Sequence, residues 1–161
     1  GEKANNDITQ QLIFTYNDVQ KINRQQIINE PTLQNDTAQV LKYIYDSFGK
    51  LDSLILINKI QEQEYKELLT TYFYDRLSGN LISQIHKKWN EPGLKWENLT
   101  KTEFVYDSNN RLVSELYAHF NILFWTPNTK YEYVYNADGF LEQKIMYQPI
   151  YRQWRKIYTI E

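Results

Sequence analysis

Apolar and polar residues alternate with a period of two along most of this chain, and one short pattern returns in it. The pattern is an aromatic residue, any residue, a tyrosine and then Asp or Asn, found at Phe14–Asn17, Tyr43–Asp46, Tyr72–Asp75, Phe104–Asp107 and Tyr133–Asn136. Its tyrosine stands at positions 16, 45, 74, 106 and 135, so successive copies are 29, 29, 32 and 29 residues apart. A fixed period of this length predicts a repeat architecture.

Each repeat predicts a β-hairpin. In the second copy, Leu41, Tyr43 and Tyr45 alternate with other residues as in a strand, and Asp46-Ser47-Phe48-Gly49 has the composition of a tight turn. Strands are therefore expected to end at Tyr45, Tyr74, Tyr106 and Tyr135, and return strands to open at Ile22, Leu51, Leu81, Leu112 and Leu141. Gly49, Gly79 and Gly139 are expected at positive φ. The first copy has Gln20 there, which predicts a different turn.

The side of each strand that carries the repeat tyrosines has no charged residue. This pattern predicts an inner face with Tyr43, Tyr72, Phe104 and Tyr133 mostly buried, and an outer face with exposed Lys42, Glu103 and Glu132. Return-strand residues at the parity of the opening leucine, such as Ser53, are assigned to the same inner face. Residues 60–69 resemble a helix in isolation, but the repeat predicts a connection followed by a strand.

The predicted fold is all-β: an antiparallel up-and-down meander of about eleven strands, built from five hairpin repeats. The sequence predicts no helix to cover the apolar face, so the sheet is expected to curl into a barrel or half-barrel. Residues 1–7 are predicted to be a disordered tail, and residues 8–161 a single β-meander repeat domain.

Composition and charge argue against several classes of function. The net charge is -2, from 18 basic and 20 acidic residues, and this balance gives no indication of nucleic-acid binding. The absence of cysteine excludes disulfides, thiolate metal sites and cysteine nucleophiles. No run of about 18 apolar residues occurs, so a transmembrane helix is not expected. Charged residues on the outer face also argue against a membrane-spanning barrel.

No constellation of catalytic or metal-binding residues emerges. His86 and His119 are predicted to be separate surface residues, and the aspartates after the repeat tyrosines are typical of turns. The carboxylates are dispersed, so no glycosidase pair is predicted. The expectation is therefore a non-enzymatic protein with no catalytic residue, no metal site and no cofactor.

The aromatic residues opposite the glycine turns are the candidate ligand-binding site. Trp89 and Trp96 flank Pro92-Gly93, Trp125 precedes Pro127, and Tyr131 and Tyr133 follow on the same strand. Two interpretations stand. The cluster stacks a sugar or an apolar small molecule, or it closes that end of the sheet as core, which its repeat-locked spacing favours.

The repeat resembles the tyrosine–aspartate repeats of secreted bacterial proteins, and more closely a Bacteroidetes group of exported proteins of unknown function. The resemblance rests on Trp96–Asp107 (WENLTKTEFVYD), on the spacing of Trp125, Lys130 and Tyr135, and on Gly79-Asn80-Leu81. It spans residues 12–160 at sparse positions. It implies a porin-like meander and a secreted, periplasmic or cell-surface location in the cell envelope, with a signal segment removed, and it brings no known activity.

These observations together predict an exported, non-enzymatic binding or cell-surface module. Its expected partner is a glycan or an apolar small molecule, and not nucleic acid. The alternative is a carrier that holds a small apolar or sugar-like ligand in a barrel lumen. The oligomeric state does not follow from the sequence.

Overall fold

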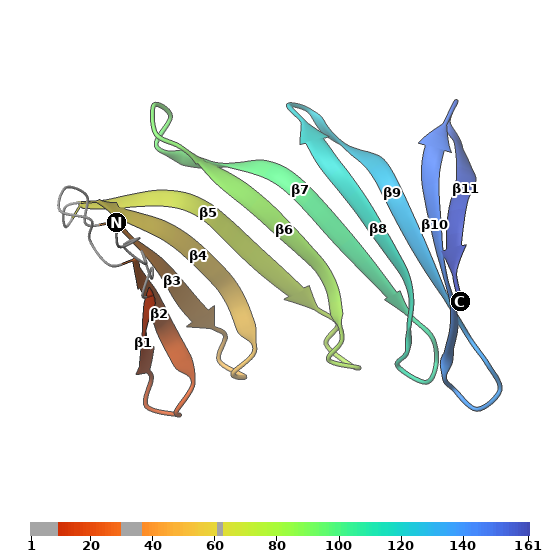
Figure 1. Ribbon diagram of the computed structural model, residues 1–161, viewed down its shortest axis with the longest axis horizontal. Helices are drawn as coiled ribbons and strands as arrows, with labels where there is room; N and C mark the ends of the chain where they lie inside the picture. Colours follow the sequence, from red (N-terminus) through yellow and green to blue (C-terminus); the bar gives the residue numbers. More distant parts are fainter. Residues whose placement is uncertain (1–9, 30–36, 61–62) are drawn as a thin grey trace, which may run out of the picture. The chain divides into compact units, whose positions relative to one another are not determined.

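The computed structural model describes residues 10–29, 37–60 and 63–161, and in these ranges it contains strands and turns but no helix (Figure 1). The strands are β1 (Gln10–Tyr16), β2 (Ile22–Asn29), β3 (Thr37–Tyr45), β4 (Leu51–Ile60), β5 (Gln63–Tyr74), β6 (Leu81–Asn90), β7 (Lys95–Tyr106), β8 (Leu112–Asn121), β9 (Phe124–Tyr135), β10 (Leu141–Ile150) and β11 (Gln153–Ile160). The expected all-β meander is confirmed. Residues 60–69 are strand wherever they are described.

All eleven strands belong to one sheet in sequence order, with β1 and β11 as its two edges. The sheet therefore does not close into a barrel, and that part of the prediction is wrong. Closure requires a ladder between the first and last strands with a fixed stagger, and the strand order contains none. The half-barrel alternative stays a prediction.

The chain divides into two compact units. Unit 1 comprises the described residues up to Thr70 together with Lys88–Trp96, and unit 2 comprises Thr71–Lys87 and Glu97–Glu161. Each unit is described by itself below. The proposed boundary between a tail (residues 1–7) and a domain (8–161) stays a prediction, because residues 1–9 lie outside the described residues, as do 30–36 and 61–62.

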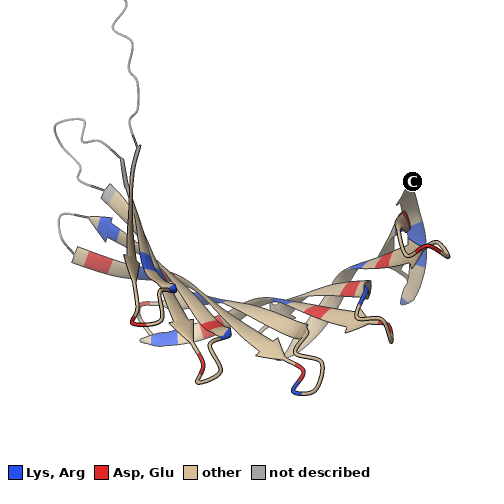
Figure 2. Ribbon diagram, turned by 90° about the horizontal axis from the view of Figure 1, so that it is seen from below, with Lys and Arg blue, Asp and Glu red and all other residues tan. Residues whose placement is uncertain are grey.

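The turns that follow the repeat tyrosines are built as the sequence predicts. Tyr45, Tyr74, Tyr106 and Tyr135 each end a strand, and each return strand opens at the expected Leu or Ile. Gly49, Gly79 and Gly139 have φ of 77°, 75° and 86°. Figure 2 shows acidic residues, in red, at these turns. In the β3–β4 turn, the Asp46 carboxylate accepts hydrogen bonds from the amides of Phe48 and Lys50.

The prediction of a different first turn is wrong. Gln20 has φ of 58°, its amide donates to the Asn17 carbonyl at 2.9 Å, and the Asn17 side chain accepts from the amides of Val19 and Lys21. Asn110 takes the same position in the fourth copy, with φ of 59°. The side-chain cap therefore holds this turn even where the fourth residue is not glycine.

A β-bulge beside Tyr16, Tyr45, Tyr106 and Tyr135 reverses the parity of the return strand. The register shifts between Ile44 and Tyr45, so Ser53 pairs with Ile44, while Tyr43 pairs with Leu54. Cross-strand partners share a face, and Ser53 therefore lies opposite the tyrosine face. The prediction that Ser53 faces the tyrosines is wrong, because the bulge adds one residue and the alternation of faces therefore shifts by one position in the return strand.

The prediction of one buried face and one exposed face is also wrong. Tyr43, Tyr72, Phe104 and Tyr133 are half-buried, and so are Lys42, Glu103 and Glu132. Among the described residues, only the following are buried: Val40, Ser53, Ile57, Thr70, Thr102 and Ala118. Val40, Ile57 and Ser53 lie on the face of Lys42, whereas Thr102 lies on the face of Phe104. Both faces mix polar and apolar residues, so neither requires a covering layer.

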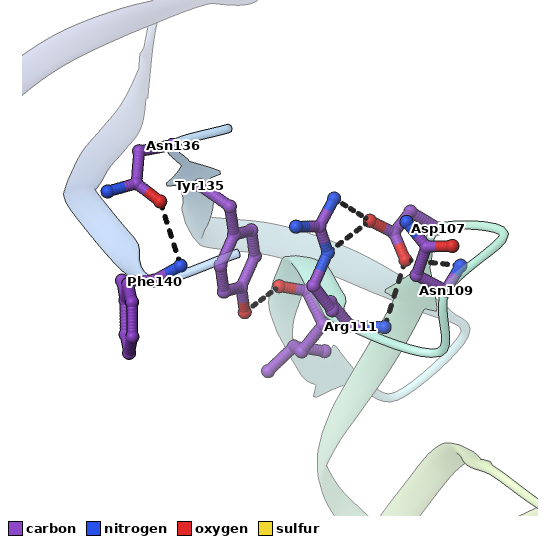
Figure 3. Close-up of polar contacts among 7 residues, drawn as sticks. Asp107, Asn109, Arg111, Tyr135, Asn136 and Phe140 are labelled. Atoms are coloured by element: carbon purple, nitrogen blue, oxygen red, sulfur yellow. Dashed lines mark hydrogen bonds and ion pairs between the residues drawn. The ribbon is translucent and has the colours of Figure 1, made fainter. Parts of the chain in front are cut away.

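The repeat tyrosine joins each of two hairpins to the hairpin before it. The Tyr135 hydroxyl donates to the Leu112 carbonyl at 2.9 Å, and the Arg111 guanidinium lies 4.7 Å from the Tyr135 ring (Figure 3). In unit 1, Tyr45 donates in the same way to the Ile22 carbonyl at 2.8 Å, with the Lys21 ammonium 5.1 Å from its ring. The recurrence of this tyrosine therefore has a structural cause.

Candidate functional site

A groove of about 690 Å³ lies on one face of unit 2 and is open to solvent. Cross-strand pairing places Glu103, Leu116 and Lys130 in one row across β7, β8 and β9, and places Val105, Ser114 and Glu132 in the adjacent row. We call the face that carries these rows the groove face. The residues that line the groove are Ile82, Glu103, Phe104, Val105, Ser114, Leu116, Pro127, Lys130 and Trp154.

Two ion pairs stand along the groove face at equivalent positions of successive repeats. The Lys101 ammonium lies 2.9 Å from the Glu103 carboxylate, and the Lys130 ammonium lies 2.5 Å from that of Glu132. The hydrogen bond from Lys130 lowers the pKa of Glu132. Its carboxylate is therefore ionised at neutral pH and acts as an acceptor, not as a proton donor. The groove thus presents fixed charges on both sides of Leu116.

Trp154 supplies the aromatic wall of the groove. It lies on the edge strand β11 opposite Pro149, and 40% of it is exposed. Pro127, Val105 and Leu116 add apolar surface. The Ser114 hydroxyl, between these residues, makes no hydrogen bond with another described residue. An aromatic wall, an apolar floor and a few polar groups are the composition of small-molecule sites.

The predicted residues Trp89 and Trp96 contact each other in unit 1. Their ring centroids are 5.0 Å apart in an edge-to-face arrangement, and the Lys66 ammonium lies 4.2 Å from the Trp89 ring. Trp89 also donates a hydrogen bond to Glu91. Both indoles are half-buried against each other. This pair therefore has partners in its own hairpin and, through Lys66, on the neighbouring strand β5.

Trp125 belongs to unit 2 and packs against the neighbouring strand. Its ring centroid is 5.0 Å from that of Phe120, its cross-strand partner, and the Lys101 ammonium lies 5.4 Å from its ring. Lys101 is the same residue that pairs with Glu103 at the groove. Trp125 therefore lies on the groove face, beside the groove, but does not line it.

Tyr131 and Tyr133 lie on the opposite face of unit 2, since their partners on β10 are Met146 and Lys144. The Lys144 ammonium is 4.3 Å from the Tyr131 ring and 5.1 Å from the Tyr133 ring. Tyr117 packs edge-on against Tyr131 at 5.8 Å and donates to Glu115 at 2.9 Å. Burial raises the pKa of Tyr117 and Tyr133, so both are neutral donors at any physiological pH.

The structure therefore separates the five predicted ligand-binding residues among three places. Trp89 and Trp96 form one pair, Trp125 packs beside the groove, and Tyr131 and Tyr133 lie on the other face. None of the five lines the groove. Trp154 does, and the signal that identifies it is the spacing of Trp96, Trp125 and Trp154, which are 29 residues apart.

The described residues contain no group of three or more His, Cys, Asp or Glu side chains placed to hold a metal ion. His119 is exposed, while burial lowers the pKa of the half-buried His86. Within the same residues, no helix has the length and apolar character needed to cross a membrane.

No protein-family model and no curated protein matches this chain. Among solved structures, a protein of unknown function from Bacteroides fragilis is 15% identical, with a TM-score of 0.52 over 98% of this chain and 95% of that one. At this identity the likeness shows the fold alone. Two DUF3836 family proteins also match in part. The one from Bacteroides vulgatus has 18% identity and a TM-score of 0.47, and covers 57% of this chain and 98% of its own. The one from Parabacteroides distasonis has 17% identity and a TM-score of 0.41, and covers 50% and 76%.

Proposed function

We propose that this protein is an exported, non-enzymatic binding module that holds a segment of glycan in the groove of unit 2. The observation that carries the proposal is the composition of the groove, in which Trp154 faces the same space as Ser114, Glu103 and Lys130. A sugar ring presents an apolar face to an aromatic ring and hydroxyls to polar side chains. The groove contains both an aromatic ring and polar side chains.

A purely apolar ligand fits this groove less well than a glycan. Glu103 and Lys130 stand on either side of Leu116, and a hydrocarbon would cover these charges without giving them a hydrogen bond. A carrier with its ligand in a barrel lumen is not proposed, because the sheet does not close.

The absence of activity is proposed from the state of the charged groups. Lys101, Glu103, Lys130 and Glu132 are all in ion pairs, and hydrogen bonding from Lys130 lowers the pKa of Glu132. General acid catalysis in a glycosidase needs a carboxyl group whose pKa is raised. The charged side chains of the groove face are therefore arranged in pairs, as groups for recognition.

Export is supported by the resemblance of the repeat pattern to exported Bacteroidetes proteins, and the likeness of fold to a Bacteroides protein is compatible with it. Fractionation of native cells tests this part. Recovery in the periplasm, the envelope or the medium is expected, and recovery in the cytosol would contradict it.

Glycan binding is tested with an oligosaccharide array, followed by calorimetric titration of the hits. Trp154→Ala should weaken binding about fivefold, since aromatic stacking is worth on the order of 1 kcal/mol. Tyr158→Ala is the matched control. Tyr158 lies on the same strand, opposite Met146 and so on the tyrosine face, and should leave binding unchanged.

Equal loss of affinity in the two variants would place the glycan outside the groove. A wild-type protein that binds no glycan but binds fatty acids or sterols through Trp154 would replace the glycan assignment. Catalytic turnover of any bound glycan would overturn the non-enzymatic part.

A further inference from the structure

The turns at the end of unit 2 away from the repeat tyrosines expose large apolar residues. We call the β8–β9 turn (Ile122 and Leu123) and the β10–β11 turn (Tyr151 and Arg152) the far-end turns, and both lie at the upper end of Figure 1. Ile122 is 90% exposed, Leu123 82% and Tyr151 92%. β9 pairs with β10 from Lys130–Tyr147 to Tyr135–Leu141, so the two hairpins are neighbours in the sheet, and both turns lie beyond the far end of this ladder.

These residues also occupy an unfavourable backbone region. Ile122 has φ of 61°, Tyr151 of 51° and Arg152 of 65°. Positive φ is rare for a β-branched or bulky residue, and tight hairpin turns normally use Gly, Asn or Asp there. The Leu123 amide closes the β8–β9 turn with a 2.5 Å bond to the Asn121 carbonyl, two residues back. Backbone strain does not stabilise the free protein, and neither do exposed apolar side chains. Their occurrence in the same turns therefore indicates that these residues contact a partner.

The β8–β9 and β10–β11 hairpins carry no acidic residue near their turns. Residues 116–131 and 143–160 contain no Asp or Glu, although the chain has 20 acidic residues. Arg152, Arg155 and Lys156 are exposed and form no ion pair with a described residue. Cationic side chains without an ion-pair partner among the described residues therefore lie beside the exposed Tyr151 in the β10–β11 hairpin. Exposed apolar side chains together with cationic side chains fit a partner that has an anionic surface and an apolar layer beneath it.

We propose that the far-end turns of unit 2 bind the surface of an anionic lipid bilayer. The interfacial region takes up Ile122, Leu123 and Tyr151. Transfer of apolar and amphipathic aromatic side chains into this region lowers the free energy. Arg152, Arg155 and Lys156 contact the phosphates of the headgroups, each adding electrostatic attraction that salt weakens. The protein lies on the membrane and does not span it. The proposal does not depend on glycan binding, because none of these residues lines the groove.

The test is co-sedimentation of the whole protein with vesicles of phosphatidylcholine alone or of phosphatidylcholine with phosphatidylglycerol. Binding is expected to the anionic vesicles only, and to fall with added salt. Ile122→Ser combined with Leu123→Ser, and separately Tyr151→Ser, should each lower the partition coefficient about tenfold. Arg152→Gln with Arg155→Gln and Lys156→Gln should abolish the preference for anionic vesicles.

The matched control is Leu77→Ser with Phe140→Ser. These residues are equally apolar and are 98% and 72% exposed, but they lie in the turns at the other end of unit 2, beside Asp75 and Asp138. The control should bind vesicles as the wild type does. Absence of vesicle binding, or equal losses in the control and tip variants, overturns the proposal. Retention by an acidic protein column without vesicle binding also overturns it.

Discussion

At one end of unit 2, Gly79, Asn110 and Gly139 occupy positive φ, whereas at the other end Ile122, Tyr151 and Arg152 take the same backbone region. The first set are residues that tolerate it, and their turns are capped by Asp75, Asp107 and Asn136. The second set pay a steric cost of roughly 1 kcal/mol or more per residue without such a cap. The first end is therefore built from residues that stabilise its turns, whereas the second exposes strained apolar turns, as the proposed membrane contact requires.

The largest expected effect comes from removing a tolerant residue. Gly49→Val should destabilise the protein by about 2 kcal/mol or more, because φ is 77°, a region that a β-branched residue adopts only with strain. Urea unfolding followed by circular dichroism measures the change. Gly93→Ala is the control, since this exposed glycine of the same unit is not at positive φ. Equal destabilisation by both would remove backbone strain as the cause.

The reverse change at the far end should stabilise the protein. Replacing Tyr151 by Asn together with Arg152 by Gly gives the turn its preferred residues, and the free energy of unfolding should rise by about 1 kcal/mol. The same variant should bind anionic vesicles less well than the wild type. A variant with unchanged stability would show that the turn is not strained.

The tyrosine contact between hairpins should contribute less. Tyr135→Phe removes the hydroxyl that donates to the Leu112 carbonyl and should cost about 1 kcal/mol. Tyr151→Phe is the matched control, because its hydroxyl has no partner among the described residues and the ring is 92% exposed. Thermal unfolding of the two variants side by side measures the difference. A cost in Tyr151→Phe equal to that in Tyr135→Phe would contradict the proposed role of this contact.

The smallest effect concerns the Asp107 cap. Hydrogen bonds from the amides of Arg111 and Asn109, together with the Arg111 guanidinium, lower the pKa of Asp107 from 3.8. Because the folded value is the lower one, its stabilisation is complete above pH 3.8 and is lost as the pH falls through the folded value. Asp107→Asn, the residue used at Asn17 and Asn136, should flatten this acid-side loss. Unfolding curves from pH 2 to pH 6, about two units on either side, test it.

The strand plan could be predicted from the sequence because it is encoded locally. Tyr45, Tyr74, Tyr106 and Tyr135 carry both the alternation and the turn chemistry, so the strand ends follow from them. The faces could not be predicted, because a bulge such as the one beside Tyr45 adds one residue to the hairpin, and Ser53 then changes sides.

The candidate site was predicted less well, for a related reason. Trp125, Tyr131 and Tyr133 lie on one strand within nine residues, yet the bulge between Tyr117 and Ala118 and the strand alternation place them on different faces. Trp154 follows Trp125 at the repeat period of 29 residues, but its strand lacks the tyrosine–Asp/Asn motif, so the motif did not single it out. Ile122 and Tyr151 gave no turn signal at all, since neither residue type favours a turn.

The hydroxyl contact of Tyr135 has a consequence for how the sheet comes apart. Since each such tyrosine is anchored to the hairpin before it, the loss of one hairpin removes a contact from its neighbour but leaves more distant hairpins intact. Each hairpin is then stabilised mainly by its nearest neighbours, as in stacked repeat proteins. Amide hydrogen exchange should accordingly show graded protection within each unit, with the least-protected amides on the edge strands β1 and β11.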